Sequence, residues 1–338
     1  MKKILFMLLT LSLTLASCSS DSVNTDSENP NLNTTLRVND NLRNLRKNAL
    51  VDLNRGGRIY YYAERGAIFH ADNNSNIVIP PYSIKTRNGE DINGILDIDY
   101  IEIFEKSKMV VANTPTMALI NGEKDLLVTG GEFYIDIRYE RKQVEIVRPI
   151  KVNIDAQNSD ADPRGMVLWN GDIDDNGDLT WLPANPNDLI FENDGKVFNG
   201  REKEPVYDIL INNSRSLGWC NVDKLINFPG DKTNVKVIVP SNFDQTNSSV
   251  YVAVEGQNNM IFQLDTFNSG TNSFKFSSDI ASVGLNVHLI FVAEMNGNYV
   301  YSIFSTTLGN NSSYVIPNNS LISTTNYQQL EAAIMALP

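Results

Sequence analysis

GEFYIDIRYE (Gly131–Glu140) decides the fold class of this 338-residue chain. Apolar or aromatic residues occupy every second position of the stretch: Phe133, Ile135, Ile137 and Tyr139. A two-residue period is typical of an antiparallel strand with one buried face. The earlier stretch ILDIDYIEIFE begins with the same alternation and then changes face, so we expect a β-bulge near Tyr100. The region therefore predicts β-structure.

Working outward, we expect a mainly β chain with two antiparallel, Ig-like β-sandwich modules, a turn-rich segment between them and a short C-terminal helix. The expected boundaries are a signal peptide at 1–17, a lipidated cysteine and tether with a short helix at 18–57, a first sandwich at 58–156, the turn-rich segment at 157–228, and a second sandwich plus helix at 229–338. Asn296-Gly297 predicts a type I′ hairpin turn. Thr325-x-x-Gln328 predicts a capping box for the final helix.

The N-terminus has the pattern of an export signal. Lys2 and Lys3 precede an apolar run that ends near Leu15, and small residues follow. The run is shorter than the roughly 18–20 apolar residues of a membrane-spanning helix. LASC, ending at Cys18, resembles a bacterial lipobox, which implies lipidation of Cys18. A plain signal peptide with an incidental cysteine is the alternative.

After Cys18, the chain is rich in Ser, Asn, Thr and Asp up to about residue 40, which predicts a flexible tether. The helix expected at 41–53 carries Arg43, Arg46 and Lys47 opposite its leucines, and we expect this basic face to be solvated. The net charge of −12 disfavours nucleic acid and anionic lipid as partners, since both need a basic surface. The expected membrane contact is the N-terminal lipid anchor.

Two segments resemble parts of Bacteroidota lipoproteins. The first likeness, an IPP opening and a closing GGEF, is carried by Ile79, Pro80, Pro81, Ser83, Ile84, Met109, Gly130, Gly131, Glu132 and Phe133. Its opening also resembles ZU5-type β-modules. The second, a GWxNxD stretch, is carried by Gly218, Trp219, Asn221 and Asp223. The resemblance implies an exported, lipid-anchored β-protein of the outer membrane, facing the periplasm or the cell surface. It offers no activity.

A candidate calcium loop lies in GDIDDNGDLTW. Asp172, Asp174, Asn176 and Asp178 follow the spacing of the first half of an EF-hand loop. Position twelve is Pro183, where a bidentate glutamate is needed, so we favour a hairpin turn without a cofactor over bound calcium.

If that hairpin forms, Trp169 and Trp181 approach each other. On an exposed face they are candidates for stacking a sugar ring, whereas on a buried face they belong to the core, which we favour. Cys220, which has no intrachain partner once Cys18 is lipidated, is expected to be a buried structural thiol.

Catalytic signatures are weak. His70 and His288 are the two histidines, no G-x-S-x-G elbow occurs, and we assign no catalytic residue. Asp97 and Asp99 are expected on a solvated strand face. We therefore expect a non-enzymatic cell-envelope protein that binds or assembles with a glycan or an envelope protein. The alternative is a surface polysaccharide-processing hydrolase that uses two carboxylates.

Overall fold

Strands dominate the computed structural model, which describes residues 42–54, 59–174, 177–192, 197–198, 201–202, 205–213 and 217–338. The prediction of a mainly β chain is confirmed. The described helices are α2 (Arg43–Leu53), α3 (Lys106–Ala112) and α4 (Tyr327–Met335), with short 3-10 turns η1 (Ala156–Asn158), η2 (Pro186–Asp188) and η4 (Asn318–Ser320). In these ranges, no helix combines the length and the apolar character that a membrane span requires.

A nine-stranded sheet forms the centre of the first unit, residues 59–228. Its strands are β1 (Ile59–Tyr62), β4 (Ile84–Thr86), β5 (Ile95–Ile103), β6 (Met117–Ile120), β7 (Glu123–Tyr139), β8 (Lys142–Ile146), β10 (Val167–Ile173), β11 (Leu179–Pro183) and β16 (Gly218–Leu225). The hydrogen-bonded order β7-β16-β10-β11-β6 returns to β7, because β6 pairs with both β11 and β7. Five strands thus form a closed ring, which a simple two-sheet sandwich does not have.

A second sheet of this unit contains β2 (Ala67–His70), β3 (Asn76–Ile79), β9 (Ile150–Asp155), β12 (Leu189–Glu192) and β15 (Val206–Ile211). One apolar cluster includes residues of both sheets, among them Ile137 and Cys220 of the first sheet and Val152 and Ile209 of the second. A separate two-stranded sheet is formed by β13 (Val197–Phe198) and β14 (Arg201–Glu202). The core of the first unit therefore lies between its two large sheets.

The second unit, residues 229–338, also has two main sheets. One contains β19 (Ser248–Val254), β20 (Phe262–Gln263), β24 (Asn286–Met295), β25 (Asn298–Thr307) and β27 (Ile322–Thr324). The other contains β18 (Lys236–Ile238), β21 (Thr266–Asn268), β22 (Ser273–Lys275) and β26 (Ser313–Val315). A short pair is formed by β17 (Lys232–Thr233) and β23 (Ala281–Ser282). Val237, Phe274 and Phe291 belong to one buried cluster that both sheets share.

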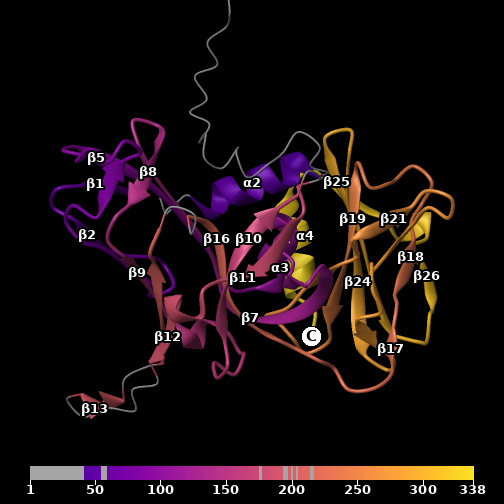
Figure 1. Ribbon diagram of the computed structural model, residues 1–338. Coiled ribbons are helices and arrows are strands. Elements are labelled where there is room, and N and C mark those ends of the chain that lie inside the picture. The colour runs from indigo at the N-terminus through magenta and orange to yellow at the C-terminus, as the bar shows by residue number, and fades with distance from the viewer. Residues whose placement is uncertain are drawn as a thin grey trace, which may run out of the picture.

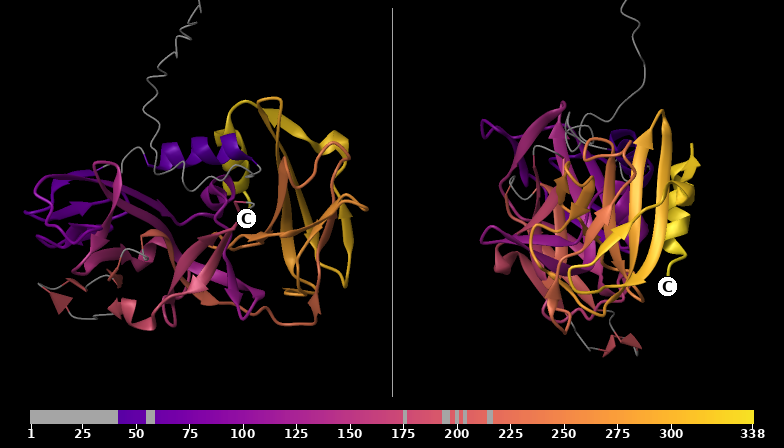
Figure 2. Two further views of the ribbon diagram at one scale, coloured as in Figure 1. Left: turned by 45° about the horizontal axis from the view of Figure 1, so that its top comes forward. Right: turned by 90° about the vertical axis from the view of Figure 1, so that its right-hand side faces the viewer.

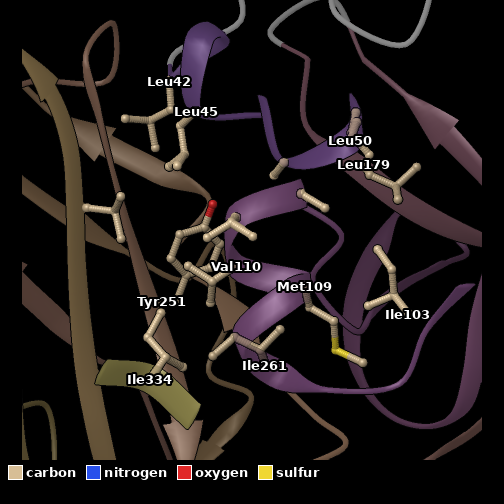
Figure 3. Close-up of a cluster of buried hydrophobic side chains, with 14 of the residues drawn as sticks. Leu42, Leu45, Leu50, Ile103, Met109, Val110, Leu179, Tyr251, Ile261 and Ile334 are labelled. Carbon is tan, nitrogen blue, oxygen red and sulfur yellow. The ribbon is translucent and has the colours of Figure 1, made fainter. Parts of the chain in front are cut away.

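The three helices lie where the two units meet. Figures 1 and 2 show α2 across the junction, with the first unit on one side and the second on the other. One apolar cluster contains Leu45 of α2, Met109 of α3, Ile334 of α4, Leu179 of the first unit and Tyr251 of the second (Figure 3). Burying these side chains together holds the two units against each other.

Polar contacts fix α2 to both units. Glu294 of β24 accepts hydrogen bonds from the backbone nitrogens of Asn44 (3.1 Å) and Leu45 (3.4 Å) at the start of the helix. At the other end, Asn54 Nδ2 donates to Asp99 Oδ1 of β5 at 3.1 Å. A carboxylate at a helix N-terminus satisfies amide groups that have no partner within the helix.

The segment expected at 157–228 is more than a turn-rich connection between two modules. It supplies β10, β11 and β16 to the first sheet and β12 and β15 to the second. Residue 156 therefore does not separate two structural units. The physical reason is that β7 and β9 would otherwise leave edges unpaired, and these later strands complete them.

The expected β-bulge near Tyr100 is wrong. β5 pairs with β7 without a register shift from Asp97 to Ile103. Ile98 and Tyr100 face one core, whereas Ile101 and Ile103 face the other. This strand is buried on both sides, so its apolar run needs no bulge.

The local turn and helix predictions are largely confirmed. Asn296-Gly297 forms the hairpin between β24 and β25, with φ values of 54° and 76°. The C-terminal helix is present, but its N-cap is Asn326, whose side chain accepts from Gln328 N, instead of Thr325. The expectation of a fully solvated basic face on α2 is wrong for Arg46, which is 1% exposed.

Candidate functional site

The two motif segments found in the sequence lie side by side. GGEF is part of β7, GWCNVD is part of β16, and the two strands pair in antiparallel fashion with Glu132 opposite Asn221. The register shifts between Val222 and Asp223, so that Asp223 is opposite Thr129 and Gly130 is the extra residue. This is a β-bulge, and it is located in the motif instead of in β5.

Thr129 connects the polar side chains of this bulge. Its hydroxyl donates to Asn221 Oδ1 at 2.7 Å, and Asn221 Nδ2 donates to Asp223 Oδ2 at 2.7 Å. The Thr129 backbone nitrogen donates to the carbonyl of Asn259 in the second unit at 3.1 Å, and its carbonyl accepts from Ser159 Oγ at 2.6 Å. The motif strands are therefore bonded to the loop at 159 and to the second unit through one residue.

The motif glycines are required by close neighbours. A β-carbon on Gly131 would lie 2.5 Å from Phe104 Cε1, and φ at Gly131 is +146°. A β-carbon on Gly130 would lie 2.8 Å from the hydroxyl of Tyr207. A side chain at either position would push an aromatic ring away, so the two glycines allow Phe104 and Tyr207 to take their places.

Two carboxyl groups of the motifs are completely buried. Burial raises the pKa of Glu132 well above its ordinary value, with a smaller contribution from the charge of Asp223 and an opposing one from the Thr114 hydroxyl. Burial likewise raises the pKa of Asp223, opposed by Thr129 and Asn221. An isolated carboxylate in an apolar interior is unfavourable, and the neutral acid is the form that such burial favours.

A cavity of about 270 Å³ lies beside this framework, where the two units meet. Phe104 and Ser107 line it from the start of α3, Ser159 from the loop after η1, Asn259 from the second unit, and Met335 from α4. Ligand sites are common between domains, and their typical volume begins at about 300 Å³. The cavity is thus of a size for one small ligand group. We call it the interface pocket.

Hydrogen bonds between the walls hold the interface pocket in shape. Lys106 N donates to the carbonyl of Asn258 at 2.8 Å, and Asn259 Nδ2 donates to Ser159 Oγ at 3.2 Å. The buried Lys106 also places Nζ 3.3 Å from the carbonyl of Leu337 after α4. All four wall segments are therefore connected before any ligand binds.

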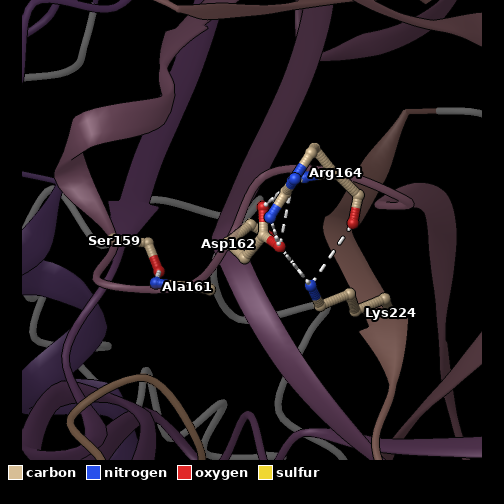
Figure 4. Close-up of polar contacts among 5 residues, drawn as sticks. All are labelled: Ser159, Ala161, Asp162, Arg164 and Lys224. Atoms are coloured by element: carbon tan, nitrogen blue, oxygen red, sulfur yellow. Dashed lines mark hydrogen bonds and ion pairs between the residues drawn. The ribbon is translucent and has the colours of Figure 1, made fainter.

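Lys224 attaches the loop that carries Ser159 to β16, and an ion pair within the loop lies beside this contact (Figure 4). Arg164 binds the Asp162 carboxylate with two guanidinium nitrogens, at 2.9 Å and 2.8 Å. Hydrogen bonds from Arg164 hold the pKa of Asp162 below its usual range. Lys224 of β16 donates to the carbonyl of Asp162 at 2.8 Å, so the loop is attached to the strand that carries the second motif.

Two polar atoms of residues that line the interface pocket have unused bonding capacity. Ser107 Oγ and Asn259 Oδ1 are buried and have no hydrogen-bond partner among the residues that the structure describes. Leaving such an atom unpaired costs about 1–3 kcal/mol. Both atoms are enclosed by protein, so they belong to the wall behind the pocket surface.

Two of the candidate calcium residues, Asp174 and Asp178, are engaged with other partners. Asp174 Oδ1 accepts from Asp178 N at 3.0 Å in the turn between β10 and β11, whereas the side chain of Asp172 is exposed. Asp178 Oδ1 accepts from Gln263 Nε2 at 3.0 Å and lies 3.9 Å from Arg46 Nη2. Across the described ranges, no three His, Cys, Asp or Glu side chains gather as metal ligands.

Two of the predicted site residues, Cys18 and Asn176, lie outside the described residues. The predicted lipidation of Cys18 stays a prediction.

Trp169 and Trp181 are in the core, which was the favoured of the two alternatives. They are 3% and 0% exposed, and their indole nitrogens donate to the carbonyls of Asp223 (3.1 Å) and Pro115 (2.9 Å). Neither ring is exposed for stacking on a sugar, and both tryptophans pack in the core. Cys220 is buried as expected, and burial raises the pKa of its thiol to about 12.

The expectation that Asp97 and Asp99 lie on a solvated face of their strand is wrong for Asp99. It is fully buried beneath the end of α2, whereas Asp97 is half-buried. The residues of the interface pocket were missed by sequence reasoning, because they come from four distant segments whose spacing carries no pattern.

A comparison of the chain with protein-family models, curated proteins and solved structures finds no match.

Proposed function

We propose that this chain is a lipid-anchored protein of the outer membrane, similar to Bacteroidota lipoproteins and facing the periplasm or the cell surface, and that its folded part is a non-enzymatic binding module. The lipobox at Cys18 and the polar tether after it support the anchor. The interface pocket supports the binding role, because both motif strands form the framework behind it. For the second unit, two facing sheets support an Ig-like sandwich, which stays part of the proposal.

The walls of the interface pocket combine polar and charged side chains with one aromatic ring. Ser159 and Asn259 line it with a hydroxyl and an amide, and Phe104 adds an apolar surface. Glu105, Lys106 and Asp160 add charges of both signs. Such a combination of a few polar groups with an aromatic wall suits a sugar unit of a glycan. The glycan is thus the favoured one of the two partner classes expected from the sequence, and a protein is the other.

Thermal unfolding of the full chain with single sugars, disaccharides and amino acids tests the binding role. A ligand that binds only the folded protein raises Tm with its concentration. We expect at least one sugar to do so for the wild type and to lose most of its effect in Asn259→Ala, which removes a wall amide. Asn310→Ala, at an exposed loop of the same unit, is the control. Equal shifts in wild type and Asn259→Ala would contradict the proposal.

The anchor has its own test. Cells fed with an alkyne-labelled fatty acid should label the wild-type chain, and Cys18→Ala should lose the label. Proteinase added to intact cells then separates the two orientations, because only a surface-exposed chain is digested before lysis. An unlabelled wild type, or label that persists in Cys18→Ala, would contradict an anchor at Cys18.

The alternative of a carboxylate hydrolase is supported by one observation, the raised pKa values of Glu132 and Asp223, which a general acid needs. Both side chains are fully buried, and the residues that line the interface pocket include neither of them. The binding role is therefore the function that the geometry supports better.

A further inference from the structure

Three hairpins of this protein share a backbone turn but differ in the residues that form it. The two-residue loops Asn121-Gly122, Glu140-Arg141 and Asn296-Gly297 join β6 to β7, β7 to β8 and β24 to β25. Both residues of each loop have positive φ, which is typical of the type I′ turn. Asn-Gly is the preferred pair for this turn, and two of the three hairpins use it. Glu140 and Arg141, at φ 49° and 64°, do not.

The Glu-Arg turn is unfavourable for the fold. The left-handed conformation brings the β-carbon of an ordinary residue too close to the next carbonyl oxygen, a clash that glycine avoids and asparagine partly compensates. Strained residues of this kind cluster at sites where their side chains are used. The surroundings of Glu140 therefore matter more than the turn itself.

Glu140 lines a groove of about 570 Å³ between this turn and the turn after β4. The other lining residues include Arg87 and Glu90 of the facing turn, and Tyr139, Lys142 and Gln143 beside Glu140. Arg87 donates a hydrogen bond to the Gln143 side chain, which connects the two turns. We call this hollow the end groove.

The chemistry of the end groove favours a neutral glycan. Arg87, Glu90, Glu140 and Gln143 end in planar groups with several donors or acceptors, which suit pairs of neighbouring hydroxyls on a sugar ring. Their charges include both signs, so no strongly charged ligand is selected. Tyr139 is half-buried and adds one aromatic surface. A protein partner would need a larger apolar area than one tyrosine provides.

We propose that the end groove is a binding site for a neutral oligosaccharide chain, and that Glu140 and Arg141 are retained in a strained turn for this purpose. The site is separate from the interface pocket, and each of the two can fail without the other. Glu140 contacts the ligand in this proposal, and Arg141 is the second residue of the strained turn.

The test replaces the strained turn by the pair that the protein uses elsewhere. The detergent-solubilised full chain is presented with immobilised cellohexaose, maltohexaose, mannohexaose and xylohexaose, and with a six-residue peptide of mixed charge. We expect the wild type to bind at least one hexasaccharide. The double variant Glu140→Asn, Arg141→Gly should lose at least tenfold in affinity and gain roughly 2–4 °C in Tm, because strain is removed.

The reverse exchange is the matched control. Asn296→Glu, Gly297→Arg places the strained pair in a hairpin of the second unit, so it should lower Tm and leave hexasaccharide binding within about twofold. Glu140→Gln keeps the turn strained but removes the charge, and it should weaken binding without raising Tm. Binding of none of the four sugars, binding of the peptide alone, or unchanged sugar affinity in the Asn-Gly variant would overturn the proposal.

Discussion

The ring of Phe104 fills the space that a side chain on Gly131 would need. Phe104 follows β5 and Gly131 lies within β7, yet a β-carbon on Gly131 would lie 2.5 Å from the ring carbon Cε1. Phe104 in turn lines the interface pocket between the two units. The second glycine of the GGEF motif therefore allows the Phe104 ring to take its place in the wall of the pocket.

Gly131→Ala should destabilise the protein by about 2–4 kcal/mol, since it adds both overpacking against Phe104 and a strained backbone. Urea unfolding measures the loss. Gly122→Ala is the control, because that glycine also has positive φ but no atom within 4 Å of its β-carbon position. It should cost about 1 kcal/mol. Equal losses in the two variants would show that the ring contact does not matter.

Stability should fall as the pH rises above the range in which free carboxyl groups titrate. The pKa values of Glu132 and Asp223 are raised in the folded protein, so the folded state binds more protons than the unfolded state above the unfolded-state values. The stability that this gives is complete below the unfolded-state pKa values, at about 4. It is lost as the pH rises through the folded-state values.

Urea unfolding from about pH 4 to about pH 9 measures this slope. Glu132→Gln and Asp223→Asn keep the shape and remove the titration, so each should reduce the loss at high pH. Glu145→Gln, at an exposed position of β8, should leave the slope as it is in the wild type. A wild-type profile that rises toward high pH, or that neither buried variant changes, would contradict the assignment.

Cys220 should be unreactive in the folded protein, because its thiol is buried and its pKa is raised to about 12. In a Cys18→Ser chain, where Cys220 is the remaining thiol, iodoacetamide at about pH 8 should label the denatured protein completely and the native protein hardly at all. Rapid labelling of the native chain would show that β16 opens readily, and would place Cys220 outside the core.

Millimolar calcium should leave Tm unchanged. Asp178 is bound to Gln263 and faces Arg46, and Asp174 is bonded within its own turn, so these two carboxylates already have partners. A calcium-dependent rise in Tm that Asp174→Ala abolishes would contradict this. Asp178→Ala, by contrast, should lower stability by about 1–3 kcal/mol without added calcium, because it removes the carboxylate opposite a buried arginine.

Glu294→Ala should loosen α2. Its carboxylate accepts from the first amide groups of the helix, and loss of such a cap costs about 0.5–2 kcal/mol. Trypsin cleavage at Arg43 and Lys47 should therefore become faster. Glu255→Ala, which removes an exposed acid of the same unit, should change neither stability nor cleavage. Unchanged cleavage in Glu294→Ala would show that apolar packing alone holds the helix.

Local features were predictable wherever one strand or turn is decided by its own residues. The strand β7 and the Asn296-Gly297 turn are of this kind, because side-chain direction and the sign of φ are properties of the backbone at those residues. The expectation that β7 has one buried face is wrong, since Tyr134 and Asp136 on its other face are buried as well. The C-terminal helix was predictable for the same reason, with an error of one residue in its cap. The expected position of the β-bulge was wrong, because β5 is buried on both faces and its change of pattern marks a change of core.

The sequence by itself determined a mainly β chain with short helices near its two ends, and it identified the two motif segments. Only the tertiary structure decided that these segments pair through Glu132 and Asn221, that Arg46 is buried against Asp178, and that four distant segments enclose the interface pocket. The physical reason is that strand pairing and burial depend on contacts between residues far apart in the chain. Local periodicity gives the direction of a side chain, whereas the partner that covers it is chosen by the packing of the whole molecule.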